Sequence, residues 1–153
     1  GSDSDTVDYS AESDKIIVTL DSVNQTRVTI NGIDNDYIQE IENITSGSGN
    51  DILTGDINAN TFKSNAGSDT LIGGAGNDYL DGGTNTDSSL ENDWVYYSSA
   101  TSTGVTVDLT KTSAQTISAT EGNDTLLNIA NLLGSHFGDT LIGNEFNNTL
   151  DGG

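Results

Sequence analysis

The chain has 153 residues, with 24 Asp and Glu against 4 Lys and Arg, so its formal net charge is −20 at pH 7. Such an acidic chain repels nucleic acid and anionic membrane surfaces, and its natural partners are cations. Cysteine is absent, which excludes a disulfide framework, and no run of about 18 apolar residues could span a membrane. Apolar residues make up only 32% of the chain, against roughly 45–50% in ordinary globular domains, so stability must come from more than a large core.

The N-terminal third is predicted to form short strands joined by irregular loops. Residues 6–10 and 15–23 predict a pair of strands, and residues 24–32 predict a further short strand with a loop. A less regular coil follows. It contains Asp36 and, 15 residues later, Asp51.

A unit rich in glycine and aspartate then recurs every nine residues from Ser46 to Gly83. Its six-residue turns read SGSGND, GDINAN, SNAGSD and GGAGND. The three residues after each turn have an apolar residue in the middle, namely Leu53, Phe62, Leu71 and Leu80. Glycines allow such turns to adopt positive φ angles, and the three residues predict a very short strand whose middle side chain faces inward. Four turns in register argue against a flexible linker.

Successive turns should alternate between two edges of a coil, so that turns 18 residues apart stack. That places Asp51, Asp69 and Asp87 on one edge, and Asn60 and Asp78 on the other. Carboxylates one strand spacing apart, about 4.8 Å, repel one another strongly. A divalent cation removes the repulsion, and Ca²⁺ accepts six to eight oxygen ligands in flexible geometry. The pattern therefore predicts Ca²⁺, whereas a single histidine and no cysteine disfavour zinc.

This repeat resembles the nonapeptide G-G-x-G-x-D-x-U-x of the RTX (repeats-in-toxin) family. The resemblance implies an all-β fold, a parallel β-roll or β-solenoid with calcium-binding turns and almost no helix. It also implies that each ion lies between two turns of one edge. The earlier turn would supply the carbonyls of its second and fourth residues and the later turn those of its first and third, with both sixth-position side chains.

Carried over residue by residue, the resemblance implies three ion sites in the regular repeats. One uses Gly47, Gly49 and Asp51 with Ser64, Ala66 and Asp69. The opposite edge uses Asp56, Asn58 and Asn60 with Gly73, Ala75 and Asp78, and a weaker site is expected there because Asn60 is neutral. The next uses Gly67 and Asp69 with Gly82, Thr84 and either Asp87 or Asp93. Residues 86–91 are interpreted as an insertion, which favours Asp93.

A shift of 88 residues superimposes much of the chain on itself, for example Tyr9 on Tyr97. We expect two units, 1–92 and a truncated 93–153, that stack as one solenoid. Two further ions are expected in the irregular coils. One would lie between Asp36 and Asp51, and the other between Asp124 and Asp139 with the carbonyls of Gly134 and His136.

The resemblance implies a non-catalytic calcium-binding segment of a large bacterial protein, secreted or at the cell surface, that folds on calcium after type I secretion. Neighbouring RTX repeats of the parent protein are possible partners. One alternative is an adhesin module that binds polysaccharide or a cell surface; the other is the C-terminal part of a secreted RTX enzyme or toxin. Trp94, Tyr96 and Tyr97 are candidates for a sugar-stacking platform, but packing against the neighbouring coil is the favoured interpretation. No G-x-S-x-G elbow or plausible Ser-His-Asp set occurs. Isolated acids such as Glu12 and Glu121 are expected at the surface.

Overall fold

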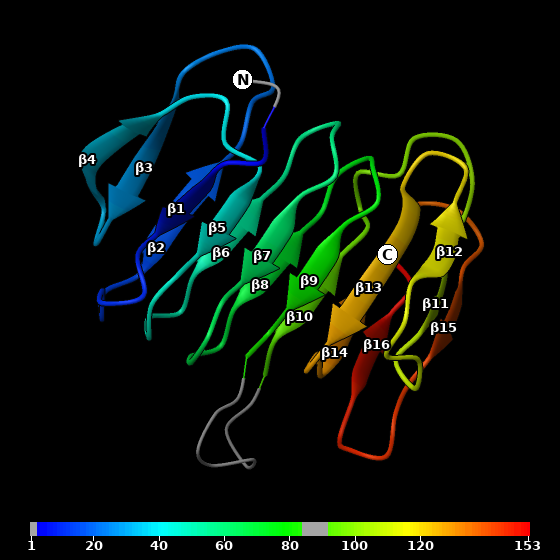
Figure 1. The fold of residues 1–153 in the computed structure, drawn as a ribbon. Helices are drawn as coiled ribbons and strands as arrows, with labels where there is room; N and C mark the ends of the chain where they lie inside the picture. Colours follow the sequence, from blue (N-terminus) through cyan, green and yellow to red (C-terminus); the bar gives the residue numbers. More distant parts are fainter. Residues whose placement is uncertain (1–2, 84–91) are drawn as a thin grey trace.

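The computed structural model describes residues 3–83 and 92–153, and within these ranges it contains sixteen strands and no helix. The prediction of an all-β parallel roll is confirmed (Figure 1). Among the described residues there is accordingly no helix that could cross a membrane. Thr84 and Asp87, two of the residues expected near an ion, lie outside the described residues.

Most strands are only three residues long. In chain order they are β1 (Thr6–Asp8), β2 (Ile16–Thr19), β3 (Thr26–Ile30), β4 (Ile33–Ile38), β5 (Asn43–Thr45), β6 (Ile52–Thr54), β7 (Thr61–Lys63), β8 (Thr70–Ile72), β9 (Tyr79–Asp81), β10 (Trp94–Tyr96), β11 (Thr106–Asp108), β12 (Gln115–Ser118), β13 (Gly122–Leu127), β14 (Asn131–Leu133), β15 (Thr140–Ile142) and β16 (Thr149–Asp151).

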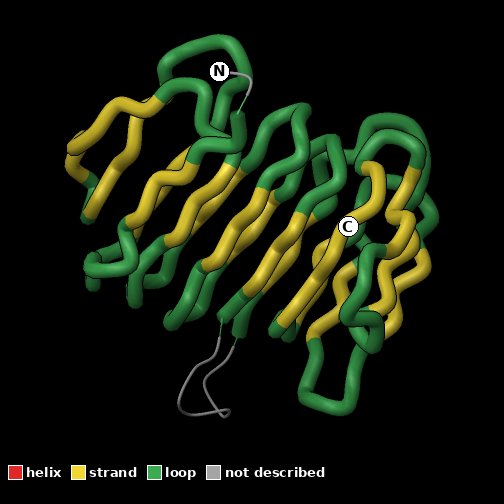
Figure 2. The backbone as a smooth tube through the Cα atoms, in the orientation of Figure 1, coloured by secondary structure: helices red, strands yellow, loops and turns green. Residues whose placement is uncertain are grey.

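The chain winds back and forth between two facing sheets, as the tube in Figure 2 shows. The first sheet has the order β1-β5-β7-β9-β13-β12, and the second has the order β16-β14-β10-β8-β6-β2-β3-β4. A small sheet pairs β11 with β15. In the regular part, parallel neighbours are 18 residues apart, such as Leu53 with Leu71 and Phe62 with Leu80. Each 18-residue coil therefore adds one strand to each sheet.

The core is a narrow ladder of inward-facing side chains. The middle residues Leu53, Phe62, Leu71 and Leu80 are all 0% exposed, while their strand neighbours remain half-buried or exposed. Because each strand contributes a single buried side chain, a coil buries its apolar surface only against the coils on either side. Stability in such a stack depends on contacts between neighbouring coils.

Two antiparallel elements interrupt the regular winding. β2, β3 and β4 form an antiparallel meander that extends the second sheet, so β4 is its last strand. β12 and β13 form an antiparallel pair later in the chain, and β13 also pairs in parallel with β9 of the first sheet. β1 lies in the first sheet, whereas β10, its counterpart 88 residues later, lies in the second.

Candidate metal centre

The aspartates that end successive turns form a column along one edge of the roll. The N–H of Ile16 donates to Oδ1 of Asp51 (2.8 Å), the N–H of Asp51 to Oδ1 of Asp69 (2.7 Å), and the N–H of Asp69 to Oδ1 of Asp93 (2.8 Å). Each carboxylate thus reaches back one coil and fixes the preceding turn with one oxygen. Asp93 takes the position after Asp69 in this column.

A second column runs along the opposite edge. The N–H of Asn60 donates to Oδ1 of Asp78 (2.8 Å), and the N–H of Asp78 donates to Oδ1 of Asp124 (2.9 Å). The other oxygen of Asp124 accepts the hydroxyl of the buried Tyr97 (2.8 Å). Asp124 therefore belongs with the nonapeptide turns, although 46 residues separate it from Asp78.

The second oxygens of three of these aspartates have no protein partner. Oδ2 of Asp51, Asp69 and Asp78 is buried and makes no hydrogen bond, and the three residues are at most 2% exposed. An ionised carboxylate buried in this way loses its hydration without compensation, at an effective cost of several kcal/mol. The columns therefore require a positive charge next to these oxygens, or protons on them.

The pKa values of the buried aspartates likewise show that the ionised carboxylate is unfavourable in this environment. Burial is the main cause that raises the pKa of Asp69 and of Asp78 to about 7, and that of Asp124 to about 6. Hydrogen bonds from backbone N–H groups oppose the shift, and neighbouring carboxylates add to it for Asp69 and Asp78. A divalent cation would reverse the balance, because an adjacent positive charge favours the ionised form.

Glycine is required where one turn passes over the carbonyl oxygens of the turn beneath. Gly67 has φ of +134°, and a Cβ there would lie 2.0 Å from the carbonyl oxygen of Gly49. Gly76 has φ of +133°, and its Cβ would lie 2.6 Å from the carbonyl oxygen of Asn58. Carbonyls of the earlier turn are thus directed at the later turn, on the edges that carry the unpaired carboxylate oxygens. Carbonyl and carboxylate oxygens together are the donor set that Ca²⁺ prefers.

Side chains alone would not hold an ion. Within residues 3–83 and 92–153, no three His, Cys, Asp or Glu side chains form a group that could bind a metal. Backbone carbonyls would therefore have to supply much of the coordination.

Comparison with protein families gives this arrangement a name. The family model described as the RTX calcium-binding nonapeptide repeat (4 copies) matches residues 41–62, 54–88 and 134–153. The chain carries RTX calcium-binding repeats. No curated protein matches it. The matched ranges include the four regular turns from Ser46 to Asp78.

The RTX turns fit calcium on two observations of this structure: the buried carboxylate oxygens without partners, and the carbonyls directed at the next turn. Gly47 and Asp56, both expected as carbonyl ligands, also accept turn-to-turn hydrogen bonds, from Ala66 N–H (3.4 Å) and Ala75 N–H (3.1 Å). A carbonyl oxygen has two lone pairs, so an ion could share these oxygens. Ser64 and Gly73 lie in the same turns, and Gly82 lies beside Asp93, whose Oδ2 a Cβ at Gly82 would approach to 2.9 Å.

The structure does not bring Asp36 and Asp51 together, as an ion between them would require. Asp36 lies on β4 at the end of the second sheet, and β2 and β3 separate that strand from β6, which follows Asp51. Asp36 instead accepts the hydroxyl of Tyr9 (3.0 Å). The antiparallel meander is the reason, because it carries β4 away from the regular coils.

The structure also does not bring Asp124 and Asp139 together, as an ion between them would require. Asp124 lies on β13, whose partners are β9 and β12, whereas Asp139 precedes β15, which pairs with β11. Asp139 accepts the N–H of Val105 (2.7 Å) and both the N–H and the hydroxyl of Ser135 (2.8 and 2.7 Å). Burial alone would raise the pKa of Asp139, but these hydrogen bonds outweigh it and lower the pKa. Gly134 and His136 lie in the same turn, and the His136 side chain is exposed.

Sequence reasoning missed Glu121, which was expected at the surface. Glu121 is only 4% exposed, and its Oε2 is buried without a hydrogen-bond partner. Burial, and then the charge of Asp124, raise its pKa, and its own charge raises the pKa of Asp78. The signal was present in the sequence: residues 121–124 read EGND, and the regular turn at 75–78 reads AGND. Glu121 therefore occupies the third position of a turn that stacks on 73–78.

Asn60 and Asn148 each donate a side-chain hydrogen bond to a carbonyl of the preceding coil. Asn60 Nδ2 donates to the carbonyl of Glu42 (3.2 Å) while its Oδ1 accepts the N–H of Asp56 (3.0 Å). Asn148, 88 residues later, donates in the same way to the carbonyl of Ala130 (2.8 Å). An aspartate could not make this contact, because its carboxylate would face a carbonyl oxygen.

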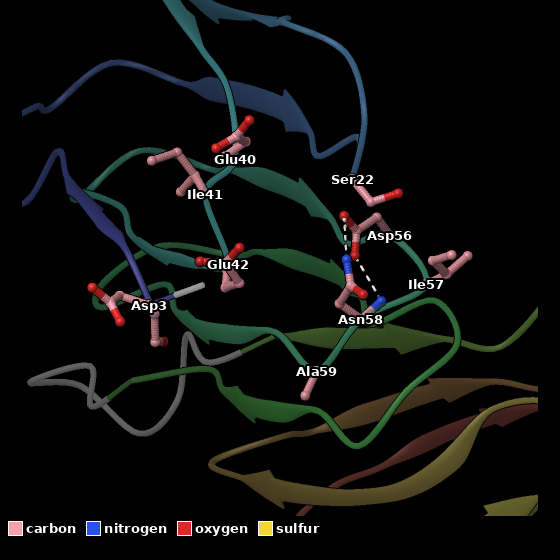
Figure 3. Close-up of a pocket in the computed structure, with 10 residues that line it drawn as sticks. Asp3, Ser22, Glu40, Ile41, Glu42, Asp56, Ile57, Asn58 and Ala59 are labelled. Atoms are coloured by element: carbon pink, nitrogen blue, oxygen red, sulfur yellow. Dashed lines mark hydrogen bonds between the residues drawn. The ribbon is translucent and has the colours of Figure 1, made fainter. Parts of the chain in front are cut away.

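One open depression lies near the N-terminal end of the roll (Figure 3). Asp3, Glu42 and Asp56 contribute acidic groups to its wall, and Asp56 accepts hydrogen bonds from the backbone and side chain of Asn58. None of the ten residues that line it is basic or a histidine. The depression therefore suits cations and water better than an anionic ligand.

Proposed function

We propose that this chain is a non-catalytic structural element of a secreted or surface-exposed bacterial protein, and that it folds when it binds several Ca²⁺ ions after export by type I secretion. The observation that carries the proposal is the pair of aspartate columns with buried, unpartnered oxygens. At a net charge of −20 the metal-free chain repels itself, so free energy of calcium binding becomes free energy of folding. Low intracellular calcium keeps the chain unfolded for passage, and higher extracellular calcium folds it.

Four pairs of sixth-position residues define the proposed ions. They are Asp51 with Asp69, Asp69 with Asp93, Asn60 with Asp78, and Asp78 with Asp124. Glu121 adds a carboxylate to the last pair. The Asn60 pair has one carboxylate fewer than the others and should bind least tightly, because ligand charge is one of the factors that tune Ca²⁺ affinity.

We also propose that residues 1–92 and 93–153 are two units of one solenoid rather than separate domains. The parallel pairing of β10 with β8 and of β13 with β9 supports this, because it joins the two halves through both sheets. Calcium bound at the Asp69–Asp93 and Asp78–Asp124 pairs would then lie across the joint between the units.

Far-UV circular dichroism tests the proposal. Addition of Ca²⁺ to chelated protein should convert a coil spectrum to a β spectrum, and chelator should reverse the change. Mg²⁺ at equal concentration is the control and should be much less effective, because it demands near-ideal octahedral geometry and dehydrates reluctantly. A chelated protein that retains its β spectrum and a cooperative thermal transition would show that calcium is not needed for folding.

A further inference from the structure

The loop between β1 and β2 lies against the first regular turn, 46–51, as one repeat turn lies against the next. The N–H of Ser48 in that turn donates to the carbonyl of Glu12 in the loop (2.9 Å). Between two regular turns of the same edge, the N–H of Ala66 donates in the same way to the carbonyl of Gly47 (3.4 Å). Glu12, which was expected at the surface, is half-buried at this contact.

The end of the same loop enters the column of aspartates. The N–H of Ile16 donates to Oδ1 of Asp51 (2.8 Å), just as the N–H of Asp51 donates to Oδ1 of Asp69 (2.7 Å). Residues 11–16 therefore occupy the place of a turn in this column. They read AESDKI, contain no glycine and lie outside the residues that the family model matches.

The loop directs two carbonyl oxygens at the turn that follows it in the column. A Cβ at Gly49 would lie 2.5 Å from the carbonyl oxygen of Asp14, and one at Gly47 would lie closer still to that of Glu12. The regular turns show the same approach where Gly67 passes over the carbonyl of Gly49. The two loop carbonyls thus take the place of those that a regular turn offers from its second and fourth residues.

A buried carboxylate belongs to the same contact. Asp51 is 1% exposed, and its Oδ1 holds the loop through the N–H of Ile16, while its Oδ2 is buried without a hydrogen-bond partner. Ile16 occupies the position where a regular turn has an aspartate, so the loop supplies no carboxylate from that position. Glu12 and Asp14 bring two negative charges to the loop instead. Carbonyl oxygens and carboxylate charge together suit a Ca²⁺ ion.

The second unit has a loop at the corresponding place, and that loop lacks these features. The N–H of Val105 at its end donates to Oδ1 of Asp139 (2.7 Å), as in the first unit. However, both oxygens of Asp139 also accept hydrogen bonds from Ser135 of the same turn (2.8 and 2.7 Å). The fourth residue of that turn is Phe137 rather than glycine. The protein itself therefore satisfies Asp139, whereas Oδ2 of Asp51 has no partner within the protein.

From this contrast we propose that the β1–β2 loop completes a further Ca²⁺ site, held by the carbonyls of Glu12 and Asp14 and the carboxylate of Asp51. Other carbonyls of turn 46–51 and water fill the remaining positions, since Ca²⁺ accepts six to eight oxygen ligands. The inference rests on the proposed function, because the ion extends the same column by one site. Asp51 then bridges two ions, as Asp69 does. The ion ties a loop that is not a repeat to the first repeat turn.

Competition of the protein with a calcium-chelating dye tests the site, because it gives both the number of bound ions and their affinities. The wild-type chain should bind five ions, four at the pairs of sixth-position residues and one at the loop. Glu12→Gln with Asp14→Asn removes two charges from the loop and leaves its carbonyls in place, and it should weaken one binding step by about ten-fold. Asp51→Asn should weaken two steps, because its carboxylate serves both ions.

Asp21→Asn with Glu145→Gln is the matched control, because it removes the same charge from two exposed side chains away from the loop. The control should bind like wild type, and circular dichroism in saturating Ca²⁺ checks that every variant is folded. A loop variant that binds calcium like the control would overturn the site, as would a wild-type chain that binds four ions, and either result would leave the proposed function intact. A wild-type chain that binds no calcium would overturn both.

Discussion

Replacement of Asp69 by asparagine should have opposite effects on stability with and without calcium. Asp69 is 0% exposed, its Oδ1 accepts the N–H of Asp51, and its Oδ2 has no partner. Asparagine keeps an oxygen for the Asp51 N–H but carries no charge. The variant therefore removes an unfavourable buried charge from the metal-free protein, and a ligand charge from the calcium-bound protein.

The magnitude follows from the pKa of Asp69. Burial raises that pKa from 3.8 to about 7, and at 1.36 kcal/mol per pH unit the ionised form costs up to about 4 kcal/mol at pH 8. Relaxation of the turn reduces this, so Asp69→Asn should stabilise the metal-free fold by about 2 kcal/mol. With calcium, loss of one unit charge should cost at least about 2 kcal/mol, since unit charges 4 Å apart attract by about 4 kcal/mol at an effective dielectric constant of 20.

Two titrations followed by circular dichroism measure these effects. In chelator at pH 8, a stabilising osmolyte folds the metal-free protein, and Asp69→Asn should fold at a lower osmolyte concentration than wild type. In saturating calcium, the same variant should unfold at a lower urea concentration. Asp21→Asn, at an exposed loop carboxylate, should change neither midpoint. Stabilisation of the fold in both titrations, or destabilisation in both, would refute the argument that the buried charge exists for the ion.

Three further predictions concern pH, glycine and the missed carboxylate. In chelator, the fold should be about 2 kcal/mol per group more stable at pH 5 than at pH 8, so less osmolyte should be needed to fold the protein at pH 5. A group whose pKa is raised in the folded state stabilises the fold fully below pH 4, and this stabilisation is lost as the pH rises through about 7. A fold that becomes less stable on acidification to pH 5 would contradict this argument for Asp69 and Asp78. Gly67→Ala forces a Cβ against the carbonyl of Gly49 at a φ of +134° and should cost at least about 3 kcal/mol in urea unfolding. At Gly138 a Cβ meets nothing within 4 Å, so Gly138→Ala should stay within about 0.5 kcal/mol, and equal losses at the two sites would disprove the close approach. Glu121→Gln should weaken one calcium-binding step in isothermal titration calorimetry and leave the other steps unchanged, whereas an unaltered titration would assign Glu121 no part in binding.

The nine-residue period was enough to predict the regular coils. A repeat of glycine, aspartate and one apolar residue fixes which side chain of each short strand faces inward, and Leu53, Phe62, Leu71 and Leu80 are all fully buried. It also fixes the 18-residue stacking, because each pairing in this region joins a residue to the one 18 positions later.

The irregular coils could not be predicted from spacing. Whether Asp36 or Ile16 lies next to Asp51 depends on the antiparallel meander, which places β2 beside β6 and moves β4 to the end of the sheet. The partner of Asp124 depends likewise on the pairing of β13 with β9, across more than 40 residues. Such pairings are decided by contacts distant in sequence, and local periodicity carries no information about them.

The two antiparallel insertions lengthen the two walls of the roll equally. The first adds β3 and β4 to the second sheet, and the second adds β12 and β13 to the first. They enter opposite walls because β1 and β10 occupy equal places in the repeat but lie in opposite sheets. The surplus strands of one insertion are therefore matched by those of the other, and the insertions themselves give neither wall more strands than its opposite.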